Sequence, residues 1–194
     1  NHFFSDKFGS IDFKSNALYS NYDTNKYKTF LTNDFIWNPS SYITSKGFVN
    51  TLQGMIRNTN YEARKTGEYK DKDTVHEVSG VLTYKTSLPM KKDGINYSNL
   101  FSPNFMVRYA PGHMRNLSGK DISLNYTNLY SLNKTSEIED GLSAILGVEF
   151  KINEKKMGDP NKEKLSLSLG QIFNYERNIN IPAKSSLDQK TSDL

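Results

Sequence analysis

Three histidines are the residues of this sequence whose chemistry could most readily support metal binding or proton transfer. His2, His76 and His113 lie far apart in the chain, cysteine is absent, and no His-x-x-x-His pair occurs. A metal site would therefore have to be assembled entirely by the fold, because the ligand spacings typical of zinc sites are missing. A solvated or hydrogen-bonded imidazole is the simpler interpretation, so the sequence predicts no metal.

Carboxylates cluster at Glu137, Glu139 and Asp140, where a pair could perform acid–base chemistry or bind a cation. The cluster directly precedes an apolar segment, which favours a solvated turn over either kind of site. The sequence has no Gly-x-Ser-x-Gly elbow, and its glycines form neither a Walker nor a dinucleotide fingerprint. We therefore expect neither an enzyme nor a bound cofactor.

The composition points to a sheet protein. Only 36% of the residues are hydrophobic, whereas 12% are aromatic, and aromatic side chains pack well on pleated, half-exposed surfaces. No stretch approaches the roughly 18 consecutive apolar residues of a membrane-spanning helix. The net charge of +4 would suit nucleic acid or a phosphorylated lipid surface. The aromatic signature of an RNA-recognition sheet is missing, so no nucleic-acid partner is predicted.

Strands must position these candidate residues. The chain repeats a segment of about ten residues in which apolar and polar residues alternate, and a polar stretch follows each such segment. The clearest segment runs from Leu142 to Ile152, where only Ile145 departs from the alternation. We expect an all-β fold, an antiparallel meander of about eight long strands. The expected strands cover, besides 142–152, the segments 9–22, 27–37, 47–58, 75–88, 104–109, 122–132 and 165–175.

Strand length distinguishes two architectures. Strands of a soluble sandwich average about 5–6 residues, whereas a transmembrane barrel needs about 9–11 residues per crossing and turns its apolar face to lipid. The long segments at 75–88, 122–132 and 142–152 favour an open, curved piece of a large transmembrane barrel. From the alternation, the candidate lumen-facing residues are Arg108, Glu149 and Lys151. The candidate lipid-facing residues are Leu142, Leu146, Val148, Phe150, Leu165, Leu167 and Leu169.

Three runs of the sequence combine a strand, a Pro turn and a basic loop, namely FMVRYAPGHMR at 105–115, NYTNLYSLNK at 125–134 and EDG at 139–141. They resemble the corresponding elements of the LptD family of lipopolysaccharide-assembly proteins. The segment 142–152 and the run KLSLSLGQIF at 164–173 resemble its Gly-rich hairpin. The resemblance spans nearly the whole chain and is densest from residue 99 onward. It departs from the family pattern at Lys134, where an Arg-rich run is expected.

The resemblance implies a function in the cell outer membrane. Members of this family deliver lipopolysaccharide to the outer leaflet through a large barrel; they are not enzymes and use no cofactor. The implied partners are lipopolysaccharide, outer-membrane lipids, an LptE-like plug lipoprotein and an LptA-like periplasmic bridge protein. We expect residues 1–194 to form one piece of the barrel, incomplete at both ends and without the lateral gate. Two alternatives remain open: another porin or receptor barrel, and a secreted adhesin or glycan-binding module.

Overall fold

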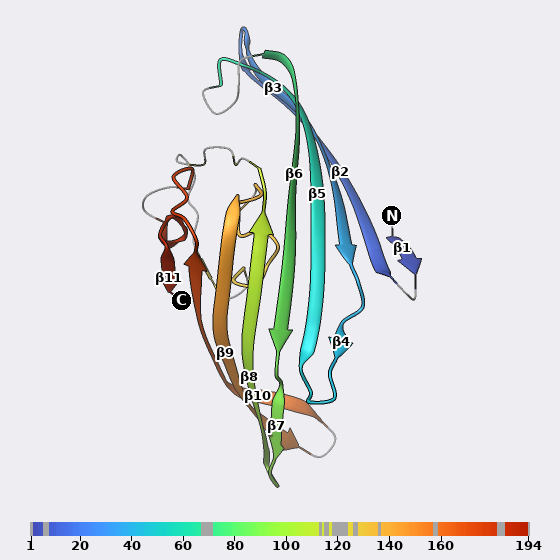
Figure 1. Cartoon of the computed structure of the whole chain (residues 1–194), viewed down its shortest axis with the longest axis vertical. Helices are drawn as coiled ribbons and strands as arrows, with labels where there is room; N and C mark the ends of the chain where they lie inside the picture. The colour runs from blue at the N-terminus through green and yellow to red at the C-terminus, as the bar shows by residue number, and fades with distance from the viewer. Residues whose placement is uncertain are drawn as a thin grey trace.

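The computed structural model describes residues 2–5, 8–66, 72–112, 114, 117, 124–125, 128–135, 137–156, 159–181 and 185–193. These residues form one antiparallel sheet in which β1, β2, β3, β5, β6, β8, β9, β10 and β11 lie side by side in that order (Figure 1). The short strands β4 and β7 pair with β5 and β8. The elements are β1 His2–Ser5, β2 Gly9–Asp23, β3 Lys26–Asn38, β4 Tyr42–Ile43, β5 Val49–Arg64, β6 Lys72–Ser87, β7 Met90–Asp93, β8 Tyr97–Ala110, β9 Gly141–Lys156, β10 Asp159–Asn174, the 3₁₀ helix η1 Ser186–Asp188 and β11 Thr191–Asp193.

The expected all-β antiparallel meander is confirmed. Within the described residues seven strands contain 13 to 16 residues each, close to the number of long strands expected. At roughly 3.3 Å per residue these strands extend for about 43 to 53 Å. That length exceeds the hydrocarbon core of a bilayer, which is about 30 Å thick.

The β2–β3 hairpin shows how local sequence sets the sheet register. Asp23 pairs with Lys26 across the turn, and Asn25 has a φ of 59°. Asparagine tolerates this left-handed conformation better than most residues, because its short polar side chain can bond locally. The turn therefore fixes a continuous ladder from Asn21 and Tyr27 to Ser10 and Asn38.

The strand expected at 122–132 is wrong. Ile122 and Tyr126 lie outside the described residues, and the described part of this segment is turn and irregular chain. Asn125 and Asn128 each accept a hydrogen bond from the other's backbone N–H, at 3.0 and 2.9 Å. Asparagine side chains that bond the backbone in this way stabilise turns at the expense of strands. Leu129, which is out of phase with the apolar alternation of this segment, packs against the sheet and is fully buried.

The two faces of the sheet differ in what covers them. We call the face that carries Leu142, Leu146 and Leu167 the apolar face; these side chains are about half exposed, at 44%, 50% and 52%. The opposite face carries Arg108 and Ile145. Against its β8–β10 region pack described parts of the 114–140 connection and of the chain that follows β10 (Figure 1).

The main core lies on this opposite face. Met106, Ile145 and Ile172 stand in one row across β8, β9 and β10, and each is almost fully buried. Ile145, the residue that breaks the alternation of its segment, is thus the centre of a core. The residues that cover this row are Met114, Leu117, Leu129, Ile181 and Leu187.

Candidate functional site

The apolar face is a continuous surface built by cross-strand rows. Phe101, Phe150 and Leu167 form one such row, and Pro103, Val148 and Leu169 form the next. All seven candidate lipid-facing residues lie on this face, five of them more than a third exposed, with Val148 and Phe150 partly buried. Their assignment to lipid remains a proposal, taken up below.

The same face continues over the other half of the sheet. Ile11, Phe35, Ile56 and Leu82 expose between 45% and 58% of their surface on β2, β3, β5 and β6. Water-soluble monomers rarely expose contiguous apolar patches of more than a few hundred Å² (about 300–600 Å² for the largest). A face of this extent is typical of a surface that meets lipid or another protein.

A row of polar side chains crosses the apolar face on β2, β3, β5 and β6. Ser15 donates to Asn33 at 2.7 Å, and Asn33 donates to Asn58 at 3.5 Å. Asn60 donates to Asn58 at 2.6 Å and meets the His76 Nδ1 atom at 2.5 Å. The expectation of a hydrogen-bonded imidazole is therefore confirmed for His76. His113 lies outside the described residues, as does the side chain of His2.

On the opposite face, two glycines make room for the covering segment. Gly147 and Gly170 pair directly across β9 and β10 and are called the glycine pair below. A Cβ on Gly170 would lie 2.3 Å from Leu129 Cδ2, and a Cβ on Gly147 would lie 2.1 Å from the Tyr130 hydroxyl. The Tyr130 ring also lies beneath the Lys85 ammonium, 4.4 Å from its centroid. The absence of two side chains thus lets residues 129 and 130 approach the sheet backbone.

A buried charged cluster fixes the next part of this segment. Arg108 donates from Nε to the Leu132 carbonyl at 2.7 Å, and its Nη2 atom lies 3.2 Å from Glu139 Oε2. Glu139 Oε1 accepts the backbone N–H groups of Lys134 and Thr135 at 2.7 and 2.5 Å. Arg108 and Glu139 expose only 2% and 6% of their surface. The solvated turn expected for the acidic group is therefore wrong for Glu139, which neutralises a buried guanidinium.

The cluster also changes the acidity of a lysine in the covering segment. Burial and, to a smaller extent, the positive charge of Arg108 lower the pKa of Lys134 to about 8, although Glu139 acts in the opposite direction. Asp140, which follows Glu139 in the sequence, accepts a hydrogen bond from Asn178 at 2.7 Å. These contacts tie the segment before β9 to the segment after β10.

The structure separates the three candidate lumen-facing residues into two groups. Glu149 and Lys151 lie on the opposite face and form an ion pair of 2.8 Å, with Glu163 3.9 Å from the same ammonium. Arg108 lies on that face as well, but it is buried against Leu132 and Glu139. Only Glu149 and Lys151 remain partly exposed there.

Sequence reasoning missed the glycine pair and the Arg108–Glu139 contact. The Leu-Gly-Gln run around Gly170 contributes to the family resemblance, but nothing in the neighbouring sequence indicates that Leu129 packs against it. Over the described residues no group of three His, Cys, Asp or Glu is placed to hold a metal ion. Nor is any helix of the described residues long and apolar enough to cross a membrane.

Comparison with known proteins identifies the family of this chain. A search of curated proteins returns no match. The family model described as "LptD: LPS transport system D" matches residues 2–194, which is nearly the entire chain. Members of this family are outer-membrane proteins that act in lipopolysaccharide transport rather than in catalysis. The long antiparallel strands agree with the match, and the chain belongs to the LptD family.

Proposed function

We propose that residues 1–194 form part of the wall of a transmembrane barrel that delivers lipopolysaccharide to the outer leaflet of the outer membrane. The apolar face lies against lipid, and the opposite face lines the lumen. The observation that carries this proposal is the row structure of the apolar face, where Leu142, Leu146 and Leu167 remain half exposed. The opposite face buries its apolar residues under the covering segment and partly exposes the Glu149–Lys151 ion pair beside it.

The physical argument starts from the backbone. A segment can cross hydrocarbon only if its backbone N–H and C=O groups are bonded, because each unsatisfied group costs several kcal/mol. The ladders between β2 and β3 and between β8 and β9 run almost without interruption along the strands. Together with strands that exceed the bilayer core in length, these ladders support a membrane wall over a soluble sandwich, whose apolar faces would be covered by a second sheet.

The lumen side supports passage of a polar substrate beside a fixed obstruction. Residues 128–135 and 137–139 pack on the opposite face at the glycine pair and at Arg108, so they narrow the proposed lumen there. Glu149 and Lys151 lie farther along β9, outside this covered area, and are the proposed polar lining that lipopolysaccharide sugars pass. The plug lipoprotein and the periplasmic bridge protein are proposed as partners on the family resemblance. The family match favours this function over the porin, receptor and adhesin alternatives.

Charge substitution on the two faces tests the proposal. In the full-length protein Leu167→Arg places a charge on the apolar face, and Ser168→Arg places the same charge on the opposite face one residue away. An arginine facing lipid costs about 2–4 kcal/mol near the bilayer midplane, whereas a lumen position tolerates it. We expect Leu167→Arg to lower the amount of assembled barrel and of surface lipopolysaccharide, with Ser168→Arg close to wild type. Equal tolerance of the two substitutions would remove the basis of the lipid-facing assignment.

A further inference from the structure

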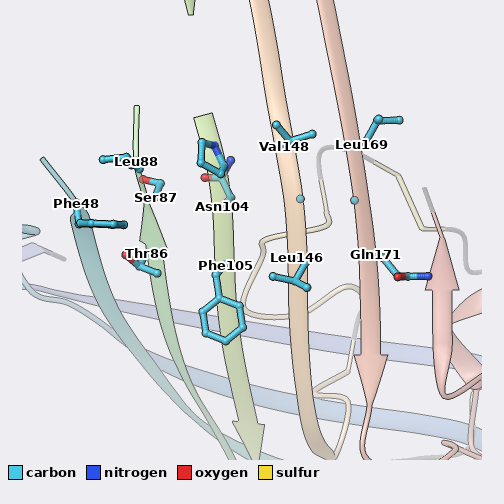
Figure 2. Close-up of a pocket in the computed structure, with 13 residues that line it drawn as sticks. Phe48, Thr86, Ser87, Leu88, Asn104, Phe105, Leu146, Val148, Leu169 and Gln171 are labelled. Carbon is cyan, nitrogen blue, oxygen red and sulfur yellow. The ribbon is translucent and has the colours of Figure 1, made fainter. Parts of the chain in front are cut away.

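The apolar face contains a hollow of about 750 Å³ across β6, β8, β9 and β10 (Figure 2). Phe48 and Leu88 stand on one side of it, and Leu169 stands on the other. Between them run the row of Pro103 and Val148 and the neighbouring row of Phe105 and Leu146. The hollow exists because Pro103 and Val148 have short side chains, while the residues around them are longer.

The lining of the hollow is mainly apolar and suits a hydrocarbon occupant. None of the described residues that line it is charged, and the backbone beneath it is already bonded in the β6–β8, β8–β9 and β9–β10 ladders. Its polar lining residues are the uncharged Thr86, Ser87, Asn104 and Gln171, and Asn104 already donates to the Ser102 carbonyl. A hydrocarbon chain in the bilayer has no hydrogen bonds to lose and gains van der Waals contacts with the apolar side chains.

The dimensions agree with one acyl chain. Four adjacent strands, about 4.8 Å apart, give the hollow a reach of roughly 14 Å. One leaflet of a bilayer is about half of its 30 Å hydrocarbon core, so a single chain covers a similar distance. The volume of about 750 Å³ also falls within the range of small-ligand sites.

We infer that this hollow is a binding site for one acyl chain of a phospholipid. The inference rests on the proposed function, since it requires the apolar face to meet the membrane. A zwitterionic phospholipid is favoured over lipopolysaccharide as the source of the chain. Its headgroup carries its own cation beside the phosphate, whereas the phosphates of lipopolysaccharide need cationic partners, and none of the described lining residues is Lys or Arg. The hollow is continuous with the rest of the apolar face through Leu146 and Leu169.

Photocross-linking of the full-length protein tests the inference. The protein is placed in nanodiscs of phosphatidylcholine that contain a small fraction of phosphatidylcholine with a diazirine on one acyl chain, and cross-linked residues are mapped by mass spectrometry. Leu167 and Leu169 form a matched pair: each is 52% exposed on the same face of β10, but only Leu169 lines the hollow. We expect several-fold more cross-linking at Leu169 than at Leu167.

A filling variant distinguishes a bound chain from passing lipid. Val148→Trp occupies the hollow, and Phe150→Trp, on the same face of β9 but outside the hollow, is its control. We expect Val148→Trp to remove the excess of cross-linking at Leu169 over Leu167 without changing the cross-linking at Leu167. Phe150→Trp should preserve that excess. An excess that survives Val148→Trp would show that the hollow is not its origin.

The remaining outcomes separate the inference from the function on which it rests. Equal cross-linking at Leu167 and Leu169 would overturn the acyl site and leave the lipid-facing wall intact. Cross-linking at Leu167 alone would mean that protein covers the hollow. Loss of the excess on addition of lipopolysaccharide, but not of unlabelled phospholipid, would overturn the choice of phospholipid. Absence of acyl cross-links over the whole apolar face would refute the proposed function itself.

Discussion

Exchanging side-chain volume between Gly170 and Leu129 would test whether the glycine pair holds the covering segment on the sheet. In Gly170→Ala the new methyl group would lie 2.3 Å from Leu129 Cδ2, while the next nearest atoms, Leu129 Cγ and the Leu146 carbonyl oxygen, lie at an ordinary 3.5 Å. The conflict therefore involves one side-chain end and not the backbone. Removing that side-chain end should relieve it.

The magnitudes follow from packing. Overpacking a filled site costs about 1–3 kcal/mol, so Gly170→Ala should destabilise the docked segment by that amount. Leu129 is fully buried, and its replacement by alanine should cost about 2–5 kcal/mol through lost transfer energy and a cavity. In the double variant the methyl group of residue 170 occupies part of that cavity without a clash. Its cost should therefore fall below the sum of the single costs by about 1–3 kcal/mol.

Hydrogen exchange at residues 128–135 in the full-length protein measures docking directly, and denaturant unfolding measures the effect on the stability of the whole protein. Gly80→Ala on β6 is the matched control, because its Cβ would meet only the Met55 carbonyl oxygen, at 3.4 Å. The control should leave exchange at 128–135 unchanged. Strict additivity of the two single substitutions would refute the packing of Leu129 against Gly170.

Three further predictions concern charged groups on the opposite face. Glu139→Ala should destabilise the protein by about 3–5 kcal/mol in denaturant unfolding, because it leaves the Arg108 guanidinium buried without its ion partner; a loss below 1 kcal/mol (about the value of an exposed pair) would contradict the burial of this pair. The pKa of Lys134 is lowered to about 8, so the folded state binds fewer protons than the unfolded state between that value and the ordinary lysine pKa. Stability should therefore rise as pH increases through this window, and the Lys134→Met variant, compared by unfolding midpoints against pH, should lose that rise; an identical pH dependence in both proteins would count against the burial of this amine. Arg57→Met should cost about 1–3 kcal/mol, because Asp34 would lose a charge-assisted contact with two hydrogen bonds of 2.7 and 2.8 Å; Asp34→Asn in the Arg57→Met background should recover part of the loss, and no recovery would contradict this account.

The strands could be predicted because each depends mainly on its own residues. In the strand from Leu142 to Ile152, alternate side chains share a face, and this arrangement does not depend on the structure of the rest of the chain. The same rule failed at 122–132, where Asn125 and Asn128 form a turn that alternation cannot reveal. Local pattern therefore predicts a strand only where no side chain offers the backbone another partner.

The candidate site was predicted less completely, because its contacts join residues distant in sequence. The packing of Leu129 on Gly170 depends on two segments meeting in space, and a glycine in a strand does not reveal what approaches it. Glu139 looked like a member of a solvated acidic turn, since its partner Arg108 lies on another strand. Ile145 looked like an irregularity for the same reason, although it is the centre of the core.

The glycine pair has a consequence for how the two sides of the wall communicate. Gly147 and Gly170 border the hollow on the apolar face and touch Tyr130 and Leu129 on the other. In the proposed barrel, only peptide planes at this level would separate the hydrocarbon of the membrane from the covering segment on the lumen side. A reporter group placed in the membrane phase beside these glycines would sense displacement of that segment by a passing substrate, so transit could be followed without any label in the lumen.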